Sequence, residues 1–462
     1  MKKIKKVLIA NRGEIAVRII MALKELGIYT VAAYSEADRN ALFTKYADES
    51  ICIGPAEVSH SYLDAYKILS AAEIKNVDSI HPGIGFFAED GDFCELCNEY
   101  GFNFIGPNSK ILHQMGNKCN AKLVAKQCGV PVVSGSQNII KSIDDCKKEI
   151  KAIGLPIIMK ATSGGGGKGI RIVDTEDSIE YFYNLCKAEA LSSFSNGDIL
   201  VEQYIQNSRH VEVQIIGDKY GNVIHLGDRE CTLQRSNQKI IEECLCANIS
   251  EEVRCKIYND AIKIAKSISY VGVGTVEFLI LPDNKYYFVE MNTRLQVEHT
   301  ITELLTGIDI VKEQIKMFNG EKLSYTQEDI KFNGYAFQCR ILAENVEDYF
   351  SPSFGVIQNY TLPCGQDVRI DNGYQNGDRI TPYYDSLLCK ISCRANDKIS
   401  AIKKMRICLE NTYISGVRTN IEFLKFLICD KDFVDGNYNE VFVENIIKKF
   451  QQERREYGNE SK

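Results

Sequence analysis

The apolar positions of the first hundred residues follow two alternating periods. Val7–Ala10 is a short apolar run, Glu14–Leu26 repeats apolar residues at helical spacing, and Tyr29–Tyr34 is again rich in strand-forming residues. This strand, helix, strand order predicts a parallel sheet. Two further strands are expected at Val77–Ile80 and Asn103–Ile105, each followed by a turn containing Gly and Pro.

From about Lys118 the pattern changes to antiparallel hairpins. His210–Ile216 and Val223–Leu226 flank one turn, and Gly274–Leu281 and Tyr286–Met291 flank another. A third region starts with the expected strand Tyr335–Leu342 and continues through short strands to Tyr384. It ends with expected helices at 398–411, 419–429 and 438–450.

These changes predict a chain that is part α/β and part α+β. The expected domains are 1–117 with a parallel sheet, 118–332 with an antiparallel sheet and 333–450 with mixed structure. The charged tail 451–462 is expected to be loose.

Composition narrows the function classes. The 462 residues, 45% hydrophobic and 25% charged, suit an ordinary globular protein, and a formal net charge of -7 argues against a nucleic-acid partner. No run of about 18 apolar residues predicts a membrane span. The 17 cysteines occur without an export signal. We therefore expect reduced thiols and a cytoplasmic protein.

The segment GTVEFLILPDNKYYFVEMN carries the strongest chemical signal. A turn centred between Asp283 and Asn284 places Glu277 opposite Glu290 on one face. Opposed like charges repel, and a divalent cation held by oxygen ligands, with Asn292 as a third, relieves the repulsion. The same register places Leu279 opposite Phe288 as an apolar surface for a base such as adenine. The hairpin therefore predicts the floor of a Mg-nucleotide site.

The period-2 pattern continues as a row of five polar residues with Met291, Leu295 and Val297 between some of them. The row is Glu290, Asn292, Arg294, Gln296 and Glu298. It indicates either substrate-binding side chains or, more simply, an exposed edge strand with one wet face.

Two other segments are less specific. Four consecutive glycines before Lys168 follow an expected strand that ends near Lys160, and such a loop either grips phosphate or serves as a linker. Lys118 is a further cation that could face the same anion. The polar run Glu230–Lys239 is typical of a solvated loop, and His81, His210 and His299 are more often structural than catalytic.

Together these segments resemble the biotin carboxylase family within the ATP-grasp superfamily, from about Ile4 to Phe450. The matching stretches are IANRGEIAVRII, HPGIGF, MGNKCNAK, IIMKATSGGGGKGIR, VEQYI, RHVEVQ, RECTLQR, QKIIEE, VEFLI, FVEMNTRLQVEHTITE, CRILAE and PYYDSLLCKI. The resemblance implies a central ATP-grasp domain with a mobile lid at about 131–205.

The resemblance also implies roles for individual residues. The implied ATP-binding residues are Lys118, Lys160, Gly166, Gly167, Glu202, Gln203, Tyr204, Ile205, His210, Gln234, Asn237, Glu277, Leu279 and Glu290. Glu277, Glu290 and Asn292 would bind two Mg2+ or Mn2+ ions. Lys239, Arg294, Gln296 and Val297 would bind bicarbonate, Glu298 would be the base, and Arg340 and Asp385 would contact biotin, with Arg340 stabilising its enolate.

Four positions depart from the family pattern. Ile84 stands where the family has tyrosine, Ser163 replaces a lid glycine, Ser236-Asn237 replaces Arg-His, and Thr300 replaces proline. The polar row itself is intact, so the resemblance implies an active enzyme with a changed ATP or biotin contact.

The chain contains no Met-Lys-Met motif. The resemblance therefore implies a separate biotin carboxyl carrier protein, separate carboxyltransferase subunits and a homodimer, with the acetyl-CoA carboxylase of fatty acid synthesis as the first expectation. Two-subunit pyruvate or acyl-CoA carboxylases, another ATP-grasp ligase and a non-catalytic nucleotide-binding subunit are the alternatives.

Overall fold

The computed structural model describes residues 3–136, 139–162, 169–194 and 196–460. Its first part is the expected parallel sheet, in the strand order β3-β2-β1-β4-β5. The strands are β1 (Lys6–Ile9), β2 (Tyr29–Ser35), β3 (Glu49–Gly54), β4 (Ser79–His81) and β5 (Asn103–Phe104). The helices are α1 (Gly13–Glu25), α2 (Leu42–Tyr46), α3 (Ala65–Ile74), α4 (Gly91–Glu99) and α5 (Ser109–Gly116).

The middle part contains a small antiparallel sheet and most of a large one. The small sheet, ordered β7-β6-β8, consists of β6 (Ile157–Ala161), β7 (Ile170–Val173) and β8 (Ile199–Gln203). The strands that follow are β9 (Arg209–Gly217), β10 (Val223–Glu230), β11 (Gln234–Arg235), β12 (Gln238–Lys239), β13 (Ile241–Cys244), β14 (Gly272–Ile280) and β15 (Tyr286–Asn292). The helices are α6 (Lys118–Gln127), α7 (Ile143–Ile153), α8 (Ile179–Phe194), α9 (Glu251–Ser267), α10 (His299–Thr306) and α11 (Ile310–Phe318).

The last part continues the large sheet and adds helices. Its strands are β16 (Tyr335–Leu342), β17 (Glu344–Asn345), β18 (Ser351–Pro352), β19 (Gly355–Val356), β20 (Asn359–Thr361), β21 (Val368–Asn372), β22 (Arg379–Ile380), β23 (Leu387–Ala395) and β24 (Tyr413–Ser415). Its helices are α12 (Lys398–Glu410), α13 (Ile421–Cys429), α14 (Lys431–Asp435) and α15 (Phe442–Glu460).

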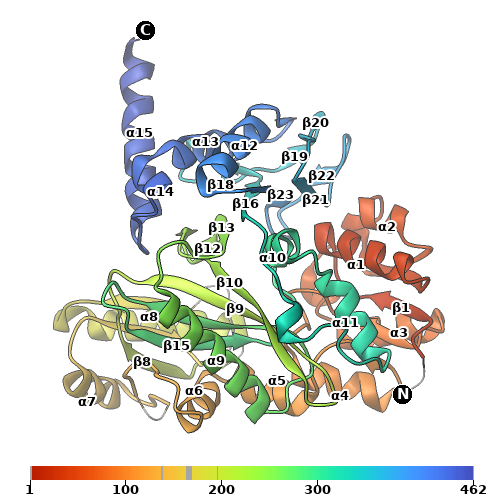
Figure 1. Cartoon of the computed structure of the whole chain (residues 1–462), viewed down its shortest axis with the longest axis horizontal. Helices are drawn as coiled ribbons and strands as arrows, with labels where there is room; N and C mark the ends of the chain where they lie inside the picture. Colours follow the sequence, from red (N-terminus) through yellow and green to blue (C-terminus); the bar gives the residue numbers. More distant parts are fainter. Residues whose placement is uncertain (1–2, 137–138, 163–168, 195, 461–462) are drawn as a thin grey trace.

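One sheet joins the middle and last parts. Its order within the described residues is β15-β14-β9-β10-β13-β16-β23-β21, and β13 pairs antiparallel with β16 along its whole length. Strands on both sides of this junction, such as β14 and β16, carry charged side chains, including Glu277 and Arg340. In Figure 1 the sheet runs from the green strands of the middle part into the blue strands of the last part.

One expectation about local structure was wrong. Residues 451–460, expected to be loose, continue α15, which leads away from the rest of the molecule (Figure 1). Apolar residues of the first half of α15, such as Phe442, Ile446 and Phe450, are buried in the core of the last part, which fixes the start of the helix. Among the described residues, no helix combines the length and apolar character needed to cross a membrane.

Candidate active site

The opposed glutamates of the β14–β15 hairpin lie as predicted. Glu277 pairs directly with Glu290, and Thr275 pairs with Asn292. Asn292 donates from Nδ2 to Oε1 of Glu277 at 2.7 Å. Glu277 is buried, and both glutamates face the same side as Asn292, so three oxygen-bearing side chains gather on one face of the hairpin.

The strand register predicted for the apolar surface beside these glutamates was wrong. A bulge follows Glu277, so Phe278 pairs with Phe288 and Leu279 pairs with Tyr287. Phe288 therefore packs with Phe278 in the buried core, with ring centroids 6.4 Å apart. The bulge reverses the side of the sheet that Phe288 faces, which a regular register cannot anticipate.

A line of charged residues crosses four neighbouring strands. Arg229 on β10 pairs with Glu212 on β9, Glu212 pairs with Glu277 on β14, and Glu277 pairs with Glu290 on β15. Directly paired residues point to the same face of a sheet. One face of the large sheet therefore carries a cation and three carboxylates in a row.

The cations expected to hold phosphates are paired with these and nearby carboxylates. Lys118, at the start of α6, donates to Glu290 Oε2 at 2.5 Å. Lys160 on β6 lies 3.0 Å from Oε2 of Glu202, and Lys122, which the sequence analysis missed, lies 2.5 Å from Oε1. Burial opposes ionisation of Glu202, but the two lysines outweigh it and lower its pKa to about 2. Lys122 is one helical turn after Lys118, a spacing that could have identified it.

The pKa of Lys118 is itself informative. Burial lowers this pKa, but the fields of Glu290, Glu202 and Glu277 raise it above its ordinary value. Lys118 therefore belongs to the same electrostatic cluster as all three carboxylates, and it remains charged. The expected phosphate contacts at Gly166 and Gly167, and the departure at Ser163, lie outside the described residues.

The residues expected around adenine and ribose occupy the end of β8 and the neighbouring strands. Gln203 is exposed, Tyr204 and Ile205 are half-buried, and the backbone N–H of Tyr204 donates to the Pro156 carbonyl at 3.0 Å. Leu279 pairs directly with His210, so the two side chains share a face. These positions form a half-buried surface beside the charged row.

His210 connects this surface to the carboxylates. Its Nε2 lies 2.6 Å from Glu277 Oε2, and its Nδ1 lies 3.0 Å from Nε2 of Gln234. Burial lowers the pKa of His210, but the Glu277 carboxylate outweighs burial and raises it. Asn237, by contrast, is exposed at the tip of the β11–β12 hairpin with φ +62.

Glu298 lies in a buried cluster of cations. Its Oε1 accepts from Lys239 Nζ at 2.6 Å and its Oε2 accepts from Arg340 NH2 at 3.0 Å. Burial would raise the pKa of Glu298, but Lys239, Arg340 and Arg229 hold it well below its usual range. Glu298 is therefore a fully ionised carboxylate that is only 1% exposed.

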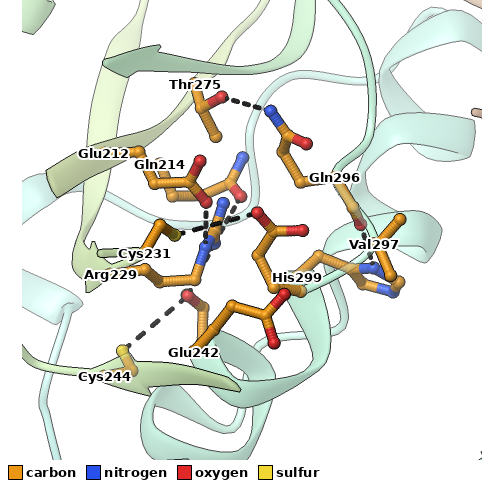
Figure 2. A network of polar contacts seen from close by, with 12 residues as sticks. Glu212, Gln214, Arg229, Cys231, Glu242, Cys244, Thr275, Gln296, Val297 and His299 are labelled. Atoms are coloured by element: carbon orange, nitrogen blue, oxygen red, sulfur yellow. Dashed lines mark hydrogen bonds and ion pairs between the residues drawn. The ribbon is translucent and has the colours of Figure 1, made fainter. Parts of the chain in front are cut away.

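The supporting network around Glu298 was not predicted. Lys239 also donates to Glu212 Oε2 at 2.8 Å, and Arg229 donates from Nε to Glu212 Oε1 at 2.6 Å. Figure 2 shows Arg229 between Glu212 and Gln214, with Cys231 beside them. Arg229 is 0% exposed and also donates to Oγ1 of Thr302 at 2.8 Å, so buried hydrogen bonds hold its guanidinium in place. The segment 230–239 is thus a hairpin with buried residues such as Cys231 and Leu233, and the expectation of a solvated loop was wrong.

The polar row does not continue as a strand after Asn292. Residues 293–298 are irregular, and Gln296 and Glu298 are buried, so neither the regular row nor the exposed edge strand was correct. The side chains still meet, because Arg294 donates to Gln296 Oε1 at 3.0 Å and to Asn292 Oδ1 at 3.2 Å. The carbonyl of Val297 accepts from buried Lys390 at 2.8 Å.

Glu89, in the loop after β4, holds this irregular segment from the first part of the chain. It accepts from Arg294 Nε at 2.8 Å and from the backbone N–H of Thr293 at 3.0 Å. No sequence pattern indicated Glu89, because the contact joins residues about two hundred positions apart. Ile84, in the same loop, is half-buried and packs against the core around α1.

Arg340 and Asp385 were both expected to contact biotin. Arg340 donates from Nε to Glu242 at 2.6 Å, in addition to its contact with Glu298. Asp385 is exposed, and its Oδ1 accepts from the backbone N–H of Leu387 at 2.8 Å. Arg340 therefore belongs to the Glu298 cluster. Within the described residues, no hydrogen bond or ion pair joins Asp385 to that cluster.

Comparison with known proteins gives this arrangement a family. Family models match residues 3–112 (Biotin carboxylase, N-terminal domain), 117–326 (Carbamoyl-phosphate synthase L chain, ATP binding domain) and 338–445 (Biotin carboxylase C-terminal domain). Biotin carboxylase 1 of Bacillus subtilis (strain 168) is 47% identical over 442 residues, which cover 96% of this chain and 98% of that protein. The chain belongs to the biotin carboxylase family.

Other members of the biotin carboxylase family are equally similar. The 2-oxoglutarate carboxylase small subunit of Hydrogenobacter thermophilus is 47% identical over 440 residues, covering 95% of this chain and 93% of that protein. The crystal structure of the biotin carboxylase domain dimer of that carboxylase, with MgADP, ADP and bicarbonate, has a TM-score of 0.94 at 45% identity and covers 97% of this chain and 99% of its own. A Campylobacter jejuni biotin carboxylase complexed with β-γ-ATP has a TM-score of 0.93 at 44% identity, covering 96% and 99%.

Membership decides the enzyme class. The chain is a biotin carboxylase, an ATP-dependent ligase that forms a C–N bond. The two flanking biotin carboxylase domains separate it from the carbamoyl-phosphate synthases, with which it shares the model of the ATP-binding domain.

Proposed function

We propose that the enzyme carboxylates biotin on a separate biotin carboxyl carrier protein, using ATP and bicarbonate through carboxyphosphate. The observation that carries the proposal is Glu298, a buried and ionised carboxylate held between Lys239 and Arg340. A base must be deprotonated before it can take the proton of bicarbonate. Lys239 and Arg340 keep Glu298 deprotonated but also lower its proton affinity; the same cations would favour ionisation of bicarbonate bound beside them.

Glu298 takes the bicarbonate proton, and the freed oxygen attacks the γ-phosphorus of ATP. ADP leaves, and carboxyphosphate then divides into CO2 and phosphate. The phosphate removes the N–H proton of the biotin ureido group, and the resulting nitrogen anion bonds to CO2. Lys239, Arg294, Gln296 and the Val297 backbone bind bicarbonate, and Arg340 stabilises the biotin enolate by its positive charge.

The nucleotide is proposed to lie over the charged row. Lys118 and Lys160 hold its phosphates, with Gly166 and Gly167 of the lid closing over them, and Lys122 adds a third cation beside Glu202. The residues proposed for adenine and ribose are Glu202, Gln203, Tyr204, Ile205, His210, Gln234, Asn237 and Leu279. Closure keeps water from carboxyphosphate, which hydrolyses readily.

The donor set fits a divalent metal. Glu277, Glu290 and Asn292 gather three oxygen-bearing side chains on one face, the ligand type that Mg2+ and Mn2+ prefer. Bound there, the metal supplies positive charge that neutralises the phosphate oxygens during phosphoryl transfer.

The carboxylase complex that the enzyme serves is a further part of the proposal. Acetyl-CoA carboxylase of fatty acid synthesis, acting in the cytoplasm with carboxyltransferase subunits and a homodimeric biotin carboxylase, is the first candidate; the Bacillus subtilis relative is named as a biotin carboxylase without an acceptor. A two-subunit carboxylase of a keto acid such as pyruvate is the alternative, because the 2-oxoglutarate carboxylase small subunit is equally identical at 47%.

Steady-state ADP release by the purified enzyme tests the reaction. We expect release from MgATP to require bicarbonate, to increase with free biotin and to disappear in Glu298→Gln. Turnover that depends on bicarbonate but not on biotin would indicate a different ATP-grasp ligase. Mixing the enzyme with candidate carboxyltransferases and acetyl-CoA, pyruvate or 2-oxoglutarate then identifies the acceptor.

A further inference from the structure

Thr300, the residue that departs from the family proline, makes a specific buried contact. It lies in the first turn of α10, two residues after Glu298, and is 0% exposed. Its hydroxyl donates to Oε1 of Gln338 on β16 at 2.7 Å. The proline that the resemblance implies at this position has no hydroxyl and could not make this contact.

Gln338 connects Thr300 to the carboxylate of Glu242 by hydrogen bonds. Its Nε2 donates to Oε2 of Glu242 on β13 at 3.0 Å, and its Oε1 also accepts from Ser392 on β23 at 3.3 Å. These three residues are directly paired across adjacent strands and share one face. The two hydroxyl donors fix the orientation of the amide, because a flipped amide would set Oε1 against an acceptor, the Glu242 carboxylate.

Glu242 in turn holds Arg340. Its Oε1 accepts from Nε of Arg340 at 2.6 Å and also contacts Nη2 of the same guanidinium, which reaches Glu298 at 3.0 Å. Glu242 is 0% exposed, so it needs both Arg340 and Gln338 to satisfy its charge. A continuous series of hydrogen bonds thus runs from Thr300 through Gln338 and Glu242 to Arg340.

We propose that Thr300, Gln338 and Glu242 form a relay of positioning residues that orients the guanidinium of Arg340 for the biotin step. The inference rests on the proposed function, in which Arg340 stabilises the biotin enolate. Glu242 holds both Nε and Nη2 of Arg340, and Nη2 also reaches Glu298 at 3.0 Å, so the guanidinium is fixed between the two carboxylates. A guanidinium displaced by about 1 Å stabilises the transition state much less well.

The test compares Thr300→Val, which removes only the hydroxyl, with Thr300→Ser, which keeps it. We expect Thr300→Val to lower biotin-stimulated kcat about tenfold, because the Gln338 acceptor loses its donor and the relay loosens. The KM for MgATP should stay within about twofold, and Thr300→Ser should restore most of the rate.

Thr306→Val is the matched control, since it removes a hydroxyl from the other end of α10, where Thr306 bonds only the local backbone at Thr302 and Ile308. It should leave biotin-stimulated kcat unchanged. Gln338→Met is a second relay variant, for use if Thr300→Val does not fold, and it should show the same biotin-specific loss.

Two results would overturn the relay. One is a biotin-stimulated kcat in Thr300→Val equal to wild type; the other is an equal fall in biotin-free ATP turnover, which would indicate a general structural role. Absence of biotin-stimulated turnover in the wild type would instead remove the proposed function, and the relay with it.

Discussion

Glu277 faces Glu290 across the β14–β15 hairpin, yet each carboxylate is paired with a different basic side chain. His210 Nε2 lies 2.6 Å from Glu277 and Lys118 Nζ lies 2.5 Å from Glu290. These two side chains are also the groups proposed for ribose and phosphate. Metal binding between the carboxylates would therefore release His210 and Lys118 to contact the nucleotide, which couples the two ligands.

The first prediction concerns that metal. Glu290→Gln should weaken Mn2+ binding in the presence of ADP at least about tenfold, a loss that even outer-shell changes at metal sites can cause. Electron paramagnetic resonance of free Mn2+ measures the affinity directly. Glu252→Gln, an exposed carboxylate on α9, is the control and should bind Mn2+ as wild type. Equal affinities in both variants would exclude Glu290 as a ligand.

The second prediction concerns Lys239, which bridges Glu212 and Glu298. Lys239→Met leaves two buried carboxylates without this partner, so bicarbonate-dependent ADP release should be lost and the free energy of unfolding should fall by about 3 to 5 kcal/mol. Urea unfolding measures the second effect. The double variant Lys239→Met/Glu212→Gln should recover part of the stability, and a failure to recover any would mean that charge is not the cause.

The third prediction is a pH dependence at His210. The Glu277 carboxylate outweighs burial and raises the pKa of His210 above 6.5 in the folded state. The ion pair therefore stabilises the fold fully below the unfolded value, and this contribution is lost as pH rises through the higher folded value. The difference in unfolding free energy between wild type and His210→Gln should shrink as pH rises above about 6.5. A difference that is constant or grows would contradict the ion pair.

The fourth prediction concerns Glu89, which holds Arg294. Glu89→Gln removes the charge that fixes the guanidinium but keeps a hydrogen-bond acceptor, so the KM for bicarbonate should rise about five- to tenfold, equivalent to about 1 to 1.4 kcal/mol. The KM for MgATP should stay within about twofold. Glu95→Gln on α4, with an exposed side chain, is the control. An increase confined to the KM for MgATP would assign Glu89 to the nucleotide instead.

The sequence predicted that Glu277 opposes Glu290, and the structure confirms that pair, but the turn is not its cause. Next to the turn the register is one residue away from the predicted one, since Ile280 pairs with Tyr286 and Leu279 with Tyr287. A bulge between Phe278 and Glu277 then restores the predicted pairing of the two glutamates. A bulge adds one residue to one strand without a distinctive sequence signal, so the pattern misplaced Leu279 and Phe288.

Contacts between distant segments were harder to predict. Glu212 and Arg229 occur in ordinary alternating strands, and only the pairing of β9, β10 and β14 places them beside Glu277. Glu89 and Glu242 likewise reach Arg294 and Arg340 from other parts of the chain. The resemblance to a family supplied residue roles, whereas the charge partners of those residues needed three-dimensional coordinates.

The pairing of β13 with β16 has consequences for truncation and for synthesis of the chain. β13 precedes β14 and β15 in the chain, yet its partner begins at Tyr335. A polypeptide ended at residue 332 would leave β13, a buried strand of sequence IEEC, with free N–H and C=O groups along one edge, a surface that can recruit strands of other molecules. During synthesis the same edge stays open until β16 emerges, so this interval is when the nascent chain is most prone to aggregate and most dependent on chaperones.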